Sequence, residues 1–240
     1  MSGHSKWSTI KRAKGVKDAK RAAVFTKIAK LINIAARDKG GDLDTNFSLR
    51  LAVDKAKAAN MPKDNIEKAI KRGTGELEGG RIEELIYEGI GPANSQFVLR
   101  VLTDNKNRSA ANVRHLFSKV GGSLGSVMWN FEMKGVVMIL KENLPDGKIN
   151  EEMELELIDF GAEDIKEEEE GVTIYSAVND LSKIKTYFEE KNINTESADI
   201  EYVAKENLEL DESELSKIES FIDSLEEDED VSDYYTNLSI

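Results

Sequence analysis

Residues 135–204 read GVVMILKENLPDGKINEEMELELIDFGAEDIKEEEEGVTIYSAVNDLSKIKTYFEEKNINTESADIEYVA. Short apolar runs with strand character alternate in this stretch with amphipathic segments of helical period. The expected order is β-α-β-β-α-β, with elements at residues 135–141, 150–160, 162–167, 172–177, 180–191 and 197–204. The run Glu168-Glu169-Glu170-Gly171 supplies the turn between the two middle strands. This order predicts a ferredoxin-like α+β domain.

The sequence on either side of this stretch holds two incomplete parts of a second α+β unit. Before it, strands are expected at 83–89, 96–103 and 127–132, with a helix at 109–120. After it, a helix is expected at 211–225 and a strand at 231–237. Because the last two elements would complete the earlier set, the acidic ferredoxin-like domain at 135–204 is predicted to be inserted in an α+β domain made of residues 76–134 plus 205–240.

Residues 1–75 are predicted to form a basic helical domain. Apolar side chains recur at helical spacing in residues 17–37, 45–59 and 63–72. Pro62 suits the first turn of the third helix, and Gly73 suits its end. The fold class is therefore α+β with three domains, an N-terminal three-helix domain followed by two ferredoxin-like α+β domains, the third inserted in the second.

The composition excludes several kinds of chemistry. The chain has 240 residues, no Cys and two His. It therefore has no disulfide framework, thiolate zinc site or cysteine nucleophile, and no metal or cofactor is expected. No apolar run approaches the roughly 18 residues that span a bilayer, and the first twenty residues contain no apolar block. Neither a membrane partner nor a secretory signal is expected.

The net charge of −13 conceals a strong asymmetry along the chain. Residues 1–72 carry 18 Lys and Arg against 7 Asp and Glu, a balance of +11. Residues 135–204 carry 6 against 19, and residues 205–240 carry 2 against 13. A basic head joined to an acidic body indicates a polyanionic partner, which means nucleic acid.

The candidate nucleic-acid-binding residues lie in the basic head, because Lys and Arg supply phosphate contacts and Trp can stack on a base. The candidates are His4, Lys6, Trp7, Lys11, Arg12, Lys14, Lys17, Lys20, Arg21, Lys27, Lys30, Lys63, Lys71 and Arg72. A second, thinner basic track would consist of Arg108, Arg114 and Lys119. The structural alternative for the lysines is a solvated basic face, with Trp7 anchoring the N-terminal residues on the helical bundle. The alternative for His4 is a disordered N-terminal residue, and the alternative for the second track is scattered surface charge.

Other conspicuous residues favour structural interpretations. His115 is expected to be a half-buried helix residue, and Trp129 with Phe131 is expected in a core. Gly121-Gly122-Ser123-Leu124-Gly125 lacks the Gly-Lys-Ser/Thr ending of a P-loop and is expected to end a helix and form a tight turn. The acidic runs 167–170 and 226–230 are expected to be solvated, to repel nucleic acid or to approach a basic protein. No nucleophile–base–orienter set is present, so the chain is not predicted to be an enzyme.

Several longer motifs resemble one known family. They are Gly3-His4-Ser5-Lys6-Trp7 with Ile10-Lys11, Ala58-Ala59-Asn60-Met61-Pro62-Lys63-Asp64-Asn65-Ile66, Ala69-Ile70-Lys71-Arg72-Gly73, Tyr87-Glu88-Gly89-Ile90-Gly91-Pro92, Thr103-Asp104-Asn105-Lys106-Asn107-Arg108 and Val113-Arg114-His115. Together with the Gly121–Gly125 segment they make the chain similar to the YebC/PmpR family over nearly its whole length. Three segments depart from the family pattern: Ala93–Gln96, the short loop after Gly125, and Thr236, where His is expected.

The resemblance implies a cytoplasmic, non-enzymatic regulator of gene expression with the three-domain fold described above. The first interpretation is a DNA-binding transcriptional regulator that acts through the basic N-terminal domain. The alternative is a ribosome-associated translation factor that binds ribosomal RNA and eases translation of proline-rich stretches. A third class is a protein scaffold, in which self-association pairs the basic domain with the acidic domain of a neighbour.

Overall fold

The computed structural model describes residues 18–210 and 212–239. Contacts between Cα atoms divide the chain into two compact units. We call residues 129–207 with 237–239 the inserted unit, and residues 18–128 with 208–236 the main unit. The names follow the sequence, because the inserted unit interrupts the main unit between residues 128 and 208.

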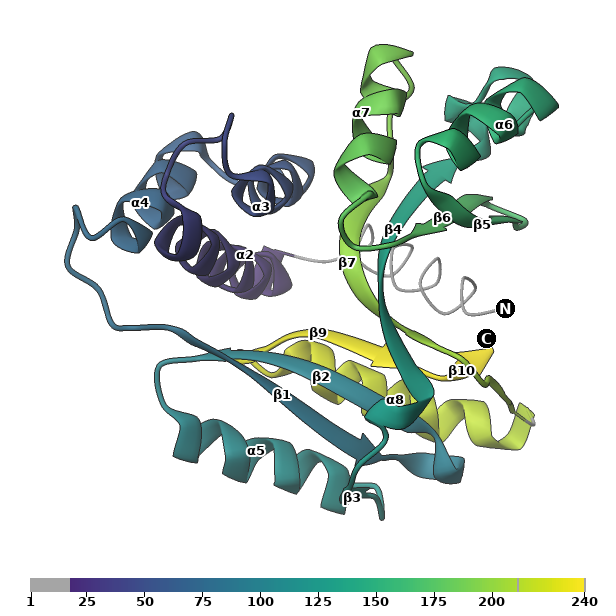
Figure 1. Ribbon diagram of the computed structural model, residues 1–240. Helices are drawn as coiled ribbons and strands as arrows, with labels where there is room; N and C mark the ends of the chain where they lie inside the picture. Colours follow the sequence, from purple (N-terminus) through teal and green to yellow (C-terminus); the bar gives the residue numbers. More distant parts are fainter. Residues whose placement is uncertain (1–17, 211, 240) are drawn as a thin grey trace. The chain divides into compact units, whose positions relative to one another are not determined.

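Three helices form the N-terminal part of the main unit (Figure 1). They are α2 (Asp18–Lys39), α3 (Phe47–Ala58) and α4 (Lys63–Gly73). Their common core contains buried aliphatic and alanine side chains from all three helices, among them Ile32, Leu49, Val53, Ala56, Ile66 and Ala69. The helical spacing of apolar residues thus gives a small bundle with thin, alanine-rich contacts.

The start of α3 is fixed by the buried side chain of Asn46. Its oxygen accepts a hydrogen bond from the Leu49 N–H at 3.0 Å, as an N-cap residue does. Its amide nitrogen donates to the carbonyls of Ala35 and Gly40 at 2.8 and 2.7 Å. One side chain therefore begins α3 and ties it to the end of α2.

The end of α4 lies against α2 at Gly73. A Cβ atom at this position would collide with the carbonyl oxygen of Asn33 and lie 2.7 Å from the Cβ of Ala36. The absence of a side chain allows the two helices to approach this closely. The rest of α4 turns its charged residues to solvent.

The remainder of the main unit is a four-stranded antiparallel sheet with the order β3-β1-β2-β9. The strands are β1 (Glu83–Ile90), β2 (Gln96–Thr103), β3 (Ser123–Leu124) and β9 (Val231–Thr236). Helices α5 (Lys106–Lys119) and α8 (Glu212–Glu227) cover one face of this sheet (Figure 1). The rings of Phe97, Phe117 and Phe221 join β2 to both helices, with centroid separations of 5.0 to 6.4 Å.

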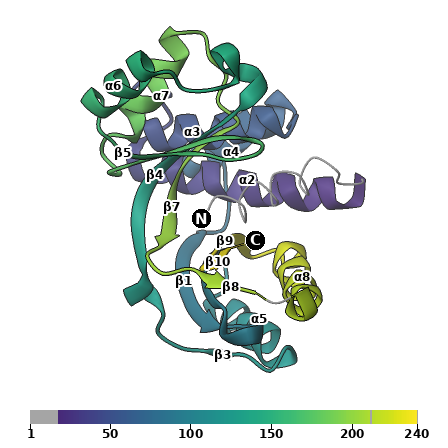
Figure 2. The same ribbon diagram turned by 90° about the vertical axis from the view of Figure 1, so that its right-hand side faces the viewer.

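The inserted unit has the β-α-β-β-α-β order. Its elements are β4 (Phe131–Leu140), α6 (Glu151–Asp159), β5 (Ala162–Glu167), β6 (Gly171–Ser176), α7 (Leu181–Glu190) and β7 (Ser197–Ala204). The strand order β5-β6-β4-β7, with antiparallel neighbours, is that of a ferredoxin-like sheet. Both helices pack on one face of it (Figure 2).

Short elements complete the described chain. Turns of 3₁₀-helix occupy Pro92–Asn94, Met128–Asn130, Lys141–Asn143 and Pro145–Gly147. The strands β8 (Leu208–Glu209) and β10 (Leu238–Ser239) are each two residues long. None of the helices in residues 18–210 and 212–239 combines the length and the apolar character needed to cross a membrane.

The structure confirms the predicted fold class, an N-terminal helical region followed by α+β sheet domains. The pairing of β2 with β9 confirms that the strand predicted at 231–237 joins the sheet formed before the insertion. The domain boundaries at residues 75/76, 134/135 and 204/205 stay predictions.

Two predicted local features are corrected. The strand expected at 127–132 is wrong, because residues 128–130 form a 3₁₀ turn and the strand runs over Phe131–Leu140. The turn is held by Glu88, whose carboxylate accepts hydrogen bonds from the N–H groups of Val127 and Met128, both at 2.7 Å. Helix α5 also begins three residues early, because Asn105 caps it by accepting from the Arg108 N–H at 3.1 Å.

Candidate nucleic-acid interface

The predicted interface residues divide into those that the structure describes and those that it does not. His4, Lys6, Trp7, Lys11, Arg12, Lys14 and Lys17 lie outside the described residues, and Lys20 lies on α2 without a described side chain. The described candidates in the basic head are Arg21, Lys27, Lys30, Lys63, Lys71 and Arg72.

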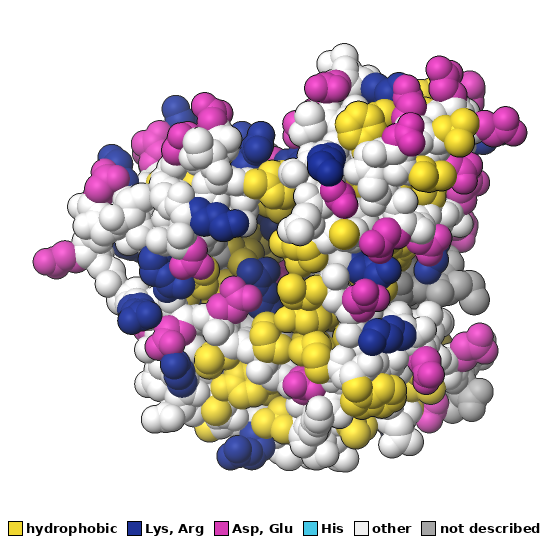
Figure 3. All heavy atoms as spheres, viewed as in Figure 1, with side chains coloured by type: hydrophobic (Ala, Val, Ile, Leu, Met, Phe, Trp, Pro, Cys, Tyr) yellow, Lys and Arg dark blue, Asp and Glu magenta, His cyan; other side chains and the backbone are white. Residues whose placement is uncertain are grey.

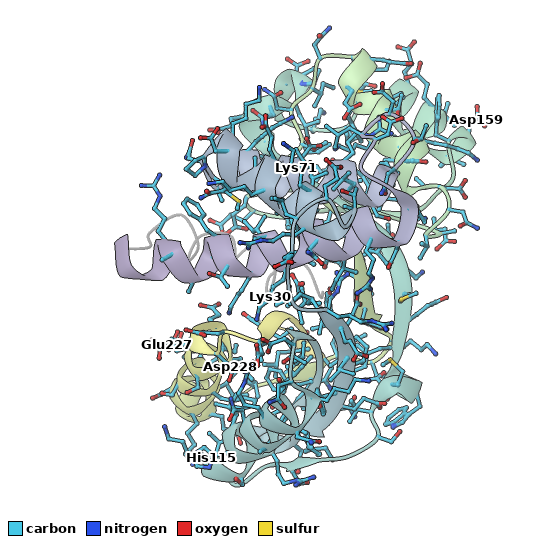
Figure 4. The ribbon with its side chains drawn as sticks, turned by 90° about the vertical axis from the view of Figure 1, so that its left-hand side faces the viewer. Lys30, Lys71, His115, Asp159, Glu227 and Asp228 are labelled. Carbon is cyan, nitrogen blue, oxygen red and sulfur yellow. The ribbon has the colours of Figure 1, made fainter. Side chains whose placement is uncertain are left out.

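The outer face of α4 carries the most open group of cations. Ile66 and Ala69 turn inward, so the other side of the helix faces solvent. At 100° per residue, Lys68, Lys71 and Arg72 fall within an arc of about 100° on that side. All three are exposed, and Lys71 is labelled in Figure 4. The sequence prediction included Lys71 and Arg72 but missed Lys68, which the helical spacing of three and four residues could have identified.

The other described candidates on an open face are less clustered. Lys63, at the start of α4, is 88% exposed in its side chain and lies 3.7 Å from the Glu67 carboxylate. Arg21, near the start of α2, is exposed and its guanidinium lies 5.9 Å from the centre of the Phe25 ring. A phosphate can compete for both cations, because an exposed ion pair and an exposed cation–π contact are each weak.

Lys30 has a different environment. Its ammonium donates to the carbonyls of Leu102 and Glu229, both at 3.0 Å, and to the Asp230 carboxylate at 2.8 Å. An ammonium has three donors, so this one is fully used within the protein. Lys30 holds α2 against the turn between α8 and β9 (Figure 4), and its role in binding phosphate stays a prediction.

Lys27 lies one turn earlier on the same side of α2. Its ammonium donates to the carbonyl of Glu226 at 2.6 Å. Burial lowers the pKa of Lys27, although the negative charges of Asp228, Asp233 and Glu226 oppose that effect. This half-buried amine faces the acidic turn of its own chain, and its role in binding nucleic acid also stays a prediction.

Asp230 is the centre of this contact. Its side chain is 5% exposed, and it accepts hydrogen bonds from Lys30, from Ser109 Oγ at 2.7 Å and from Arg108 Nη2 at 2.9 Å. Burial alone would raise the pKa of Asp230, but the hydrogen bonds from Lys30, Ser109 and Arg108 outweigh burial and lower it to about 2. The acidic run 226–230, expected to be solvated, is therefore in part a structural counter-charge for α2 and α5.

The second predicted track is not brought together. Arg108 is committed to Asp230 and Asp104. Arg114 and Lys119 are exposed, but Arg114 lies about 120° around α5 from Arg108 at 100° per residue. His115, expected to be half-buried, is exposed on the same helix (Figure 4).

The position of Trp129 is a further correction. Trp129 is 62% exposed rather than part of a core, whereas Phe131 is 5% exposed as expected. Between them, the buried Asn130 fixes the backbone: its amide donates to the Glu206 carbonyl and its oxygen accepts from the Glu206 N–H, both at 2.9 Å. The turn geometry, rather than apolar character, decides which ring is buried.

The glycine-rich segment behaves as predicted at its start. Gly121 has a φ of +76°, and the Gly122 N–H donates to the Phe117 carbonyl at 2.9 Å, which ends α5. Ser123 and Leu124 then add a short edge strand that the sequence did not indicate. Within residues 18–210 and 212–239, no group of three or more His, Asp or Glu is arranged to hold a metal ion.

Comparison with known proteins gives consistent matches over almost the whole chain. Residues 5–76 match the family model described as the TACO1/YebC protein N-terminal domain. Residues 82–238 match the model described as the TACO1/YebC second and third domain.

Individual relatives are similar over their full length. A "Probable transcriptional regulatory protein" of Thermotoga maritima is 46% identical over 243 aligned residues, covering 100% of this chain and 94% of the relative. A protein of the same name from Clostridium acetobutylicum is 46% identical, covering 99% and 96%. The crystal structure of a conserved hypothetical protein from Aquifex aeolicus has a TM-score of 0.81 at 38% identity, covering 93% of this chain and 92% of that one.

Proposed function

This chain belongs to the TACO1/YebC family, and from that premise we propose that it regulates gene expression by binding nucleic acid through its basic N-terminal region. Its curated relatives carry the name "Probable transcriptional regulatory protein", which supports a regulatory role. The proposal assigns no catalytic step to the chain.

The observation that carries the proposal is the outer face of α4. Lys68, Lys71 and Arg72 are exposed together there, within a region of the sequence that has a balance of +11. Residues 73–134 have a balance of zero, and residues 135–240 are strongly acidic and would repel phosphates. A nucleic acid therefore has one favourable approach, to the head of the main unit.

The proposed footprint is smaller than the basic composition alone indicates. Lys27 and Lys30 are bound by the acidic turn, so the proposed footprint does not include them. What remains is α4, Arg21 and the cations of the first 20 residues. Such contacts set affinity and orientation, whereas sequence preference requires contacts to base edges. We therefore propose DNA binding that is dominated by the phosphate backbone.

The test measures the affinity for a duplex of random sequence as a function of salt. The variant Lys68→Ala/Lys71→Ala/Arg72→Ala should bind more weakly, and its plot of log K against log salt should be shallower by about 0.9 for each phosphate that the variant no longer binds. The control Lys141→Ala/Lys148→Ala/Lys217→Ala removes the same charge from exposed sites elsewhere. Equal slopes in the two variants would reject α4 as the interface.

A second candidate is ribosomal RNA, in a ribosome-associated translation factor. The same observation favours it, because a face of Lys and Arg recognises phosphates of either nucleic acid. Sedimentation of the tagged chain from gently lysed cells separates the two. Co-migration with ribosomes that survives DNase and is abolished by RNase supports the RNA target, and association that DNase abolishes supports DNA.

A further inference from the structure

Helix α6 of the inserted unit has two apolar sides. Met153 and Leu157, four residues apart, are 5% and 0% exposed and face the sheet. Leu155 and Ile158, three residues apart, are 66% and 53% exposed. At 100° per residue the second pair points almost directly away from the first. A solvent-facing side of a helix is normally polar, so two large apolar residues there indicate a contact surface.

Acidic side chains surround this pair. Glu151, Glu152, Glu154 and Asp159 lie on the same exposed part of α6. Within the part of the chain that the structure describes, none of these four carboxylates has an ion-pair partner, whereas Glu156 on the inner side is bound by Lys191 and Tyr187, both at 2.7 Å. Figure 3 shows apolar and acidic side chains intermixed over the region of α6. The surface therefore suits a segment that is both apolar and basic.

The chain itself contains a segment of that composition near the start of the given sequence. Residues 6–14 read KWSTIKRAK, with four cations and two large apolar residues, Trp7 and Ile10, three positions apart. The four cations match the four unpaired carboxylates in number, and the spacing of Trp7 and Ile10 matches that of Leu155 and Ile158. We propose that the outer face of α6 binds residues 6–14 of a second copy of this chain.

A contact of this kind is heterologous, because the two copies contribute different surfaces. It links copies head to tail, and each copy keeps one free segment and one free α6 unless a ring closes. The exposed apolar area on α6 is small, so the contact should be weak and salt-sensitive. Insofar as the proposed function holds, a nucleic acid would compete for Lys6, Lys11, Arg12 and Lys14 and would dissolve the assembly.

The experiment is analytical ultracentrifugation of the full chain over a range of concentrations. At about 50 mM salt the average mass should rise with concentration, and at about 500 mM the chain should be monomeric. The variant Leu155→Gln/Ile158→Gln should stay monomeric at low salt. The control Leu43→Gln/Leu77→Gln changes two other exposed leucines, 36% and 42% exposed, and should associate like the parent. Circular dichroism confirms that each variant is folded.

A mixing experiment shows whether α6 of one copy binds residues 6–14 of another copy. The α6 variant retains its N-terminal segment, and the variant Trp7→Ala/Lys11→Ala/Arg12→Ala retains its α6. Neither should associate alone, and their mixture should form dimers and nothing larger. Three results would overturn the proposal: a parent that is monomeric at every concentration, association that survives the α6 change, or a mixture that stays monomeric. These results also cover the cases in which the segment binds α6 of its own chain or α6 binds another basic protein.

A separate experiment tests whether nucleic acid competes with the self-association. Adding a random-sequence duplex to the associated parent should return it to single copies bound to DNA. If the duplex does not bind at all, the proposed function fails while the self-association result stands. If the duplex binds and the association persists, the inferred competition of DNA for residues 6–14 is wrong, while the mixing experiment still decides whether those residues bind α6.

Discussion

The side-chain nitrogen of Lys30 lies 2.8 Å from Oδ1 of Asp230, 200 residues further along the chain. Both side chains are largely buried, with exposures of 16% and 5%. This ion pair joins α2 to the turn between α8 and β9, and it is extended by Arg108 and Ser109 on α5. Three segments distant in sequence therefore share one carboxylate.

Removing this carboxylate should destabilise the main unit. Asp230→Asn leaves Lys30 without a counter-charge and removes one of the two carboxylates that pair with Arg108. Breaking a buried ion pair from one side costs about 3–5 kcal/mol of unfolding free energy, and the loss here should lie near the lower end because Arg108 is half-exposed. Urea denaturation measures the change. The control Asp104→Asn removes an exposed partner of Arg108 and should cost about 0.5 kcal/mol or less. Equal effects of the two changes would show that Asp230 acts no differently from a surface carboxylate.

The same residue should make stability depend on pH in the acidic range. Its pKa falls from an ordinary value of 3.8 to about 2 on folding, so ionised Asp230 favours the folded state. The contribution, about 2 kcal/mol, is complete above about pH 5 and disappears as the pH falls from about 4 to 2. The difference in unfolding free energy between the parent and Asp230→Asn, followed from pH 7 to 2, should shrink over that range. A constant difference would contradict the assignment.

Two lysines of the basic head should respond in opposite ways. Lys30→Met retains the apolar stem but removes the three hydrogen bonds, so the unfolding free energy should fall by about 1–3 kcal/mol while the salt slope of nucleic-acid binding stays unchanged. Lys71→Ala should leave stability within about 0.5 kcal/mol and reduce the slope by about 0.9. The pair of measurements distinguishes a structural lysine from an interface lysine, and the reverse pattern would refute both assignments.

The two aromatic residues flanking Asn130 should differ sharply. Trp129→Ala removes an exposed ring and should change the unfolding free energy by less than about 1 kcal/mol, whereas Phe131→Ala removes a buried ring and should cost about 3–5 kcal/mol. In a Trp7→Phe background, the fluorescence of Trp129 should be readily quenched by iodide. A blue-shifted, protected emission would place the indole in a core instead.

Periodicity predicts the elements well where they are long. The bundle helices and the β-α-β-β-α-β stretch have apolar repeats that local spacing reveals, and β2, β5 and β7 have the predicted bounds. The two-residue strand β3 is too short to have a pattern. The strand expected at 127–132 is wrong because a distant carboxylate, that of Glu88, holds the backbone in another conformation.

The candidate interface is predictable only in part. Composition places cations in the head, and helical spacing places Lys71 and Arg72 on one face. Neither reveals that Lys27 and Lys30, on the same arc of α2, meet the acidic turn at residues 226–230. That contact depends on the tertiary fold. The exposure of Trp129 likewise depends on the hydrogen bonds of Asn130 to Glu206.

During translation, the β2–β9 pairing can form only after β9 has been made. The inserted unit's six main elements are contiguous between residues 131 and 204, so they can fold as soon as that stretch is made. The sheet of the main unit needs β9, and Lys30 needs Asp230, which is made 200 residues after it. During translation, the Lys30 ammonium on α2 therefore lacks its Asp230 partner until 200 further residues have been added. A nascent chain that stops short of residue 230 presents that basic face unmasked.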